Sequence, residues 1–142
     1  MQKRNFITTT SVEMVRIYFL CLLVNLLVLI FANKLAPQSV VFGTSVLTPS
    51  WSLFLSMGAL SLVNLLFVPF FEQIQQELQR DLSPKEWMIG YFFLNFVGIW
   101  LISRFAEQFG FGVSAWWVGA VLAFFLDMFQ GFAIMRYAYE KK

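Results

Sequence analysis

The sequence predicts an all-α integral membrane protein, with four transmembrane helices arranged as two helical hairpins that form a parallel repeat. Four long apolar runs carry this prediction, at 17–32, 51–71, 87–102 and 113–135. Of the 142 residues, 59% are hydrophobic and only 13% are charged, and the mean hydropathy is +0.71. A soluble domain carries about a quarter charged residues, whereas a helix that crosses a bilayer needs roughly 20 largely apolar residues. We therefore expect one transmembrane domain over residues 1–142.

The first two helices are expected at about 14–34 and 49–80. Residues 1–13 are polar, so we expect them to be frayed or to lie on the membrane surface, and the first helix should end before Pro37. Thr48 and Pro49 suit the N-cap and the first position of the second helix. Pro69 should kink that helix, which then continues as a polar, water-facing extension. The segment 38–47 is expected to be an outer loop with at most a short extended piece.

The last two helices are expected at about 84–106 and 114–139. Ser83 and Glu86 form a predicted capping box, with Pro84 at the first helical position. The segment 107–113 should be a short outer turn. Ser114 is the predicted N-cap of the fourth helix, which should run to about residue 139.

Basic residues predict how the four helices are oriented. Eight of the ten Lys and Arg fall on one side of the apolar runs and two fall on the other. The eight are Lys3, Arg4, Arg16, Arg80, Lys85, Arg136, Lys141 and Lys142, and the two are Lys34 and Arg104. Because basic residues favour cytoplasmic loops, we expect both termini in the cytoplasm.

The two halves of the chain resemble each other. The segment from Asn25 to Ala36 aligns with the segment from Asn95 to Ala106, with Lys34 opposite Arg104. The helices that follow align less well, pairing Trp51 with Trp117 and Asn64 with Gln130 after about four residues are dropped from the outer loop. Two hairpins of the same orientation predict a parallel repeat about an axis along the membrane normal.

Asp127 is the sharpest candidate for a functional residue, because it lies near the middle of the last apolar run. Placing an Asp at the centre of a transmembrane helix costs about 2.5–3.5 kcal/mol, so it should face protein or water rather than lipid. It could bind a proton or cation in a pathway, or it could be a buried polar anchor. No Lys or Arg within the runs offers a salt bridge, so we expect Asp127 to be protonated.

Four amides complete a predicted intramembrane polar seam with Asp127: Asn25, Asn64, Asn95 and Gln130. Such amides bond between helices for about 0.6 kcal/mol each, so they could serve only as interhelical glue, or they could line a pore or substrate site. Small residues predict close helix packing, within one bundle or between subunits. One is Gly98 in the third run. The others are Gly119, Ala123 and Gly131 in the fourth run, which form a stripe with Asp127 at a spacing of four residues.

Several classes of function are excluded or disfavoured. The chain has no His and one Cys, Cys21, which excludes His-based metal sites, Ser-His and Cys-His catalysis and an internal disulfide. It contains no P-loop, dinucleotide fingerprint or nucleophile elbow. We therefore expect no enzyme activity, no cofactor and no metal, and the net charge of +2 is too small to suggest a nucleic-acid partner.

The first hairpin has an Asn-led helix (NLLVLIFANKLA), a Gly-containing outer loop, and a helix ending in Val63-Asn64-Leu65 and Pro69. In these features it resembles the first hairpin of the small bacterial four-helix proteins of the phage holin family (holin superfamily IV type). The second half, NFVGIWLISRFAEQFGFGVSAWWVGAVLA, resembles the family's second hairpin, so that the resemblance covers about residues 15–130. The longer inner loop and Asp127, where the family usually has a small or hydroxyl residue, depart from it. The resemblance implies a lesion-forming role in a bacterial cytoplasmic (inner) membrane.

Three functions follow as hypotheses. The first is a holin-like inner-membrane protein that acts by helix association in the lipid bilayer, without catalysis, and self-associates. The second is an ion- or proton-coupled channel or small transporter that uses Asp127. The third is an accessory subunit that packs against a larger membrane protein.

Overall fold

The computed structural model describes residues 10–140, without the side chains of residues 135 and 137–140. Its elements, in chain order, are α1 (Ser11–Leu35), β1 (Val40–Phe42), α2 (Pro49–Leu78), α3 (Pro84–Arg104), α4 (Ala106–Phe109), β2 (Phe111–Val113) and α5 (Trp116–Glu140). Helices α1, α2, α3 and α5 are long and apolar enough to cross a membrane. The prediction of four such helices is confirmed, and the expectation of an all-α chain is corrected by the two short strands.

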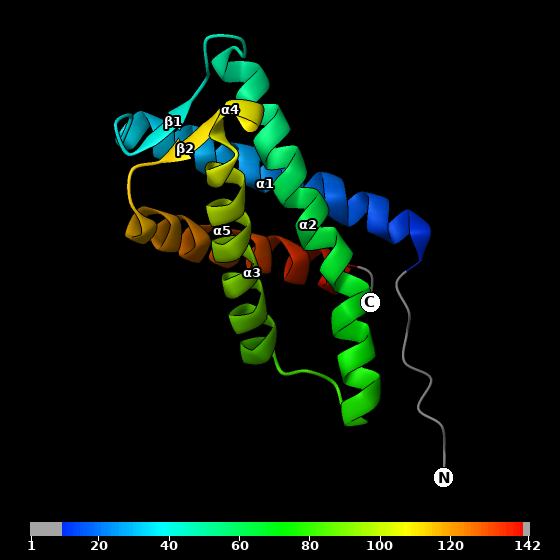
Figure 1. Ribbon diagram of the computed structural model, residues 1–142. Helices are drawn as coiled ribbons and strands as arrows, with labels where there is room; N and C mark the ends of the chain where they lie inside the picture. The colour runs from blue at the N-terminus through cyan, green and yellow to red at the C-terminus, as the bar shows by residue number, and fades with distance from the viewer. Residues whose placement is uncertain (1–9, 141–142) are drawn as a thin grey trace.

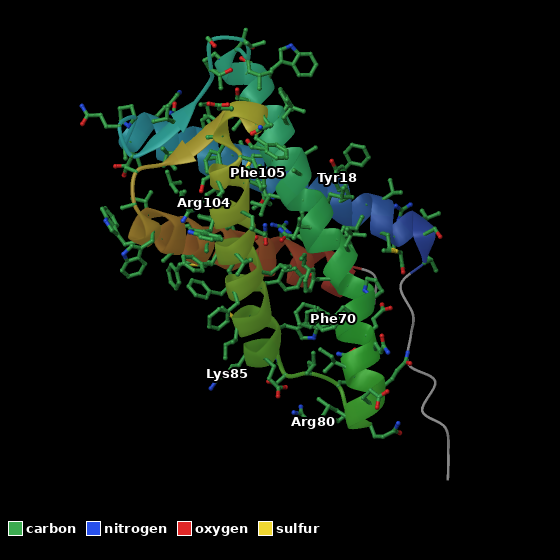
Figure 2. The ribbon with its side chains drawn as sticks, viewed as in Figure 1. Tyr18, Phe70, Arg80, Lys85, Arg104 and Phe105 are labelled. Carbon is green, nitrogen blue, oxygen red and sulfur yellow. The ribbon has the colours of Figure 1, made fainter. Side chains whose placement is uncertain are left out.

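The four long helices form a closed ring. Helix α1 packs against α2 and α5, and α3 packs against the same two helices. The strands and α4 gather at one end of the bundle, here called the strand end (Figure 1). The α2–α3 connection, the start of α1 and the end of α5 lie away from the strands, at what we call the loop end (Figure 1). Arg80 and Lys85 lie at the loop end (Figure 2), while Lys3, Arg4, Lys141 and Lys142 are outside the described residues.

Helix α1 begins at Ser11, earlier than the predicted residue 14, because a capping box starts it. The Glu13 backbone N–H donates to Thr10 Oγ1 at 3.4 Å, and the Thr10 N–H donates to the Glu13 carboxylate at 3.1 Å. Two of the backbone donors that a helix start leaves unpaired are thereby satisfied. Residues 10–13 are therefore an ordered helix start, and residues 1–9 of the predicted surface segment lie outside the described part.

The connection between α2 and α3 is ordered by side chains that bond locally. Helix α2 runs through Pro69 and ends at Leu78, two residues before the predicted 80, where Gln79 turns the chain with a φ of 54°. The predicted capping box of Ser83 and Glu86 is present, and α3 begins at Pro84 as expected. The Glu86 carboxylate also accepts hydrogen bonds from both terminal nitrogens of Arg80, at 2.7 and 2.9 Å. Helix α3 ends at Arg104, two residues before the predicted 106.

The segments 38–47 and 107–113 pair with each other as antiparallel strands. Val40 faces Val113 and Phe42 faces Phe111 in the ladder. The Asn33 side-chain amide donates to the Val40 carbonyl at 2.7 Å, which ties β1 to the end of α1. Pairing satisfies backbone groups that lipid could not. The short extended piece expected within 38–47 is therefore strand β1, whereas α4 and strand β2 replace the turn predicted at 107–113.

The start of α5 differs from the expected N-cap at Ser114. The Ser114 N–H instead donates to the Ser39 carbonyl at 3.0 Å, which extends the strand ladder. The helix begins at Trp116, and the N–H groups of Val118 and Gly119 both donate to the Ala115 carbonyl. The strand pairing takes the backbone of Ser114 and delays the helix by two residues.

A dry core fills the bundle on the strand side of its polar centre. Five of its fully buried members represent all four long helices and β2: Leu29, Leu60, Ile99, Leu126 and Phe111. The outward faces carry exposed Leu, Phe and Val side chains, as a lipid-facing surface requires. Four exposed tryptophans, Trp51, Trp100, Trp116 and Trp117, lie toward the strand end, which suits a membrane–water interface.

Candidate functional site

The four predicted amides meet in one chain of hydrogen bonds that visits every long helix. Asn64 Nδ2 on α2 donates to Asn95 Oδ1 on α3 at 3.1 Å, and Asn95 Nδ2 donates to Gln130 Oε1 on α5 at 3.0 Å. Gln130 Nε2 then donates to Asn25 Oδ1 on α1 at 2.6 Å. All four residues are at most 2% exposed. We call this set the amide chain.

Ser61 closes the amide chain and sets its direction. Asn25 Nδ2 donates to Ser61 Oγ at 2.9 Å, and the Ser61 hydroxyl donates in turn to the Met57 carbonyl at 2.7 Å. Because the single hydroxyl proton of Ser61 is committed to the backbone, its oxygen must accept from Asn25. Each earlier amide must then donate toward the next one. Ser61 was not among the predicted site residues, although its spacing of three from Asn64 puts both residues on one helical face.

The amide chain has one loose end. Asn64 Oδ1 is buried and has no hydrogen-bond partner among the described residues. Asn64 is also the first donor, so a single bond links it to the rest of the chain. Losing a member in the middle of the chain should therefore disturb the bundle more than losing Asn64.

A cavity of about 420 Å³ adjoins the amide chain on the side of the loop end. It lies between α2, α3 and α5, with Ile17 of α1 as a further contact. It extends from Leu82 in the α2–α3 connection and Pro84 at the start of α3 to Gln130. It is partly open to its surroundings. The cavity therefore connects the loop end with the polar centre of the bundle, whereas the dry core closes the strand end.

Asp127 lies in the wall of this cavity, one helical turn before Gln130. Its side chain is buried, with 6% of the residue exposed. Among residues 10–140, no side chain or backbone group forms a hydrogen bond or ion pair with its carboxyl group. Glu72 also lines the cavity, and no Lys or Arg is among the described residues that do. The structure thus places Asp127 next to the amide chain but not in it.

Aromatic side chains from the start of α3 form another wall of the cavity. Trp87 and Tyr91 stack with ring centroids 5.8 Å apart and planes 19° apart. Phe71 of α2 packs behind them, 4.9 Å from Trp87 and 5.6 Å from Tyr91. A tryptophan at the start of an apolar run is typical of the membrane interface, and neither Trp87 nor Tyr91 was predicted as a site residue. Their spacing of four, at the start of a helix that also carries Asn95, was the available signal.

The small residues that were expected at helix contacts fall in different surroundings. A methyl group added to Gly98 would come 2.6 Å from Leu60 Cδ1, so α2 and α3 approach closely there. At Gly119 it would meet Ile99 at 3.7 Å, an ordinary contact, and Ala123 is fully buried. At Gly131 no atom lies within 4 Å, because this glycine lines the cavity. The stripe is therefore a packing surface over part of its length and a cavity wall at its end.

Comparison with known proteins yields no relative: no family model, curated protein or solved structure matches the chain. Among the described residues, no three Cys, Asp or Glu side chains are grouped so that they could hold a metal ion. The chemistry of the site therefore has to be derived from its own side chains. These are one unpartnered carboxyl group, a second carboxylate, an aromatic wall and a chain of amides.

Proposed function

We propose that this chain is a membrane carrier that binds a proton or cation at Asp127, the transporter form of the second hypothesis. The observation that carries the proposal is a buried carboxyl group without a partner in the wall of a cavity. An ionised carboxylate in apolar surroundings is costly unless it is neutralised. A proton or a bound cation supplies that neutralisation, and the cavity supplies the path by which either one arrives.

The closed strand end favours a gated carrier over a permanently open pore. The cavity reaches Asp127 from the loop end, and fully buried Leu29, Ile99, Leu126 and Phe111 fill the bundle toward the strands. Passage would therefore require these side chains to separate. Such a carrier acts without catalysis and without a cofactor.

We place the loop end in the cytoplasm and the chain in a bacterial inner membrane. This orientation rests on the bias of eight basic residues against two, which puts both termini on the cytoplasmic side. The cavity would then open toward the cytoplasm. The two basic residues Lys34 and Arg104 would lie at the outer interface, where the Arg104 guanidinium sits 4.7 Å from the Trp100 ring centroid.

We also propose that the two hairpins are a duplicated unit. Exchanging α1 with α3 and α2 with α5 maps the bond from Asn64 to Asn95 onto the bond from Gln130 to Asn25. The antiparallel pairing of β1 with β2 obeys the same exchange. These correspondences support a two-fold relation about the membrane normal, the one that the sequence alignment predicts.

The holin-like and accessory-subunit hypotheses receive less support from the structure. A hydrophilic lesion needs polar surface that can face water between helices. Here the amides bond to each other inside one chain, and the outward faces are apolar. Self-association or a larger partner would show as added mass when the protein is purified natively from membranes.

Proton uptake into proteoliposomes tests the proposal. Vesicles that contain the purified protein and an internal pH-sensitive dye are energised with a potassium diffusion potential. We expect uptake by the wild type and its loss in Asp127→Asn, which keeps the shape of the side chain and removes its charge. Glu107→Gln is the matched control, because it removes an acid from α4, at the strand end and away from the cavity.

Two results would contradict the proposal. One is the absence of flux of protons and of small cations in the wild type. The other is undiminished flux in Asp127→Asn when circular dichroism and gel filtration show a folded variant.

A further inference from the structure

We propose that the cavity binds an organic cation, an amine or quaternary ammonium ion that carries an aromatic or branched apolar group. Its charge would lie against Asp127 and its apolar part against Trp87 and Tyr91. This inference rests on the proposed function, because it names the substrate class of the same site.

The charge of the cavity favours a cation. Asp127 and Glu72 are the acids in its described wall, and no Lys or Arg is among the described residues that line it. Asp127 is buried and has no partner among the described residues, so a cation that enters gains a counter-ion without first breaking a bond. When Asp127 is protonated beforehand, the cation takes the place of the proton, which leaves through the cavity. The total charge in the site then stays the same.

The aromatic wall selects an organic rather than an inorganic cation. Trp87 and Tyr91 line the cavity and their rings stack on each other, and aromatic rings attract ammonium groups within about 6 Å of the ring centroid. Calcium and magnesium ions instead require six or more oxygen ligands. The wall here is mostly apolar, and the oxygen of Gln130 already accepts a hydrogen bond from Asn95.

The aromatic wall is held in place from behind. Phe71 packs against both rings, and it can do so because residue 90 is a glycine: a methyl group there would come 2.6 Å from the Phe71 ring. The rings are therefore positioned before any ligand arrives, which reduces the entropy lost on binding.

The size of the cavity also suits such a ligand. At about 420 Å³ it falls within the range of about 300–1,000 Å³ that is typical of small-molecule sites. A mostly apolar wall with few polar groups is likewise typical of these sites. A proton or a bare metal ion would leave most of this volume unfilled.

Equilibrium binding of radiolabelled benzyltrimethylammonium to the full chain in nanodiscs tests the inference. We expect saturable binding that Asp127→Asn weakens by at least about tenfold, as for loss of a charged partner. Trp87→Leu should weaken it about 2- to 30-fold, and Trp87→Phe should retain most of the affinity because a ring remains. Trp116→Leu is the matched control, since it removes an exposed tryptophan at the start of α5, away from the cavity.

Competition on the wild type keeps the test decisive if a variant fails to fold. Neopentylbenzene has nearly the shape of benzyltrimethylammonium but no charge, so neopentylbenzene should not displace the labelled cation. Absence of saturable binding, equal displacement by the neutral compound, or full affinity in folded Asp127→Asn or Trp87→Leu would overturn the inference. Binding without flux would overturn the proposed function alone, whereas proton flux without binding would overturn only the inference.

Discussion

Replacing Gln130 by Leu should destabilise the bundle far more than replacing Asn64 by Leu. Both changes put the same apolar side chain on a helix in place of a buried amide, so their effects on partitioning into lipid are similar. They differ in their place in the amide chain. Gln130 joins α3 to α1 through two bonds, whereas Asn64 makes one bond at the end of the chain.

The expected difference follows from these contacts. Loss of Gln130 removes two interhelical bonds, about 1.2 kcal/mol at the average value for membrane proteins. It also leaves Asn25 Oδ1 and Asn95 Nδ2 buried without that partner, which raises the total cost to roughly 2–4 kcal/mol. Loss of Asn64 removes one hydrogen bond of about 0.6 kcal/mol and leaves Asn95 Oδ1 buried without a donor. It also eliminates the unpartnered Asn64 Oδ1, so the net change should lie within about 0.5 kcal/mol of zero.

Reversible unfolding in mixed micelles, by titration with sodium dodecyl sulfate, measures both changes against the wild type. The free energy of unfolding should fall markedly for Gln130→Leu and hardly at all for Asn64→Leu. Equal costs, or a larger cost at Asn64, would refute the directed amide chain and with it the role of Ser61.

Two further predictions concern the strand end and the orientation of the chain. Gly110→Ala should lower the free energy of unfolding by about 2 kcal/mol or more in the same titration, because the residue has a φ of +68° and lies tightly against α2. Gly131→Ala is the control and should be neutral, since no atom lies within 4 Å of the added methyl group. Similar costs at both sites would contradict this packing. The buried Cys21 can be replaced by Ala, and single cysteines at the exposed positions of Val46 and Asp81 should then react with an impermeant thiol reagent from opposite sides of the membrane. Only position 46 should be labelled from outside intact cells, and labelling of both positions from one side would rule out the proposed topology.

The sequence located the four long helices with small errors at their ends. Local signals with a direct physical cause worked best: Thr48, Ser83, Pro49 and Pro84 mark helix starts as expected. The capping box at Thr10 is a signal of the same kind and was overlooked. Ser114 was misassigned because its backbone bonds to Ser39, far away in the sequence, and no local pattern reports such a pairing.

The candidate site was only partly visible in the sequence. The polar residues within apolar runs stood out one by one, because each is costly in lipid. Ser61, which accepts a hydrogen bond from Asn25, did not stand out because it looks like an ordinary small residue in a helix. Trp87 did not stand out because it looks like an interfacial residue.

What the sequence determined by itself is the class of the protein, its four apolar helices and the list of polar groups that lipid would reject. These depend on composition and on spacing along a single helix. The tertiary structure alone decided that the amides join into one chain, that Asp127 stays out of it and lines a cavity, and that the outer segments pair as strands. Those outcomes depend on which faces of four helices meet, and a contact between residues up to 105 positions apart leaves no local trace in the chain.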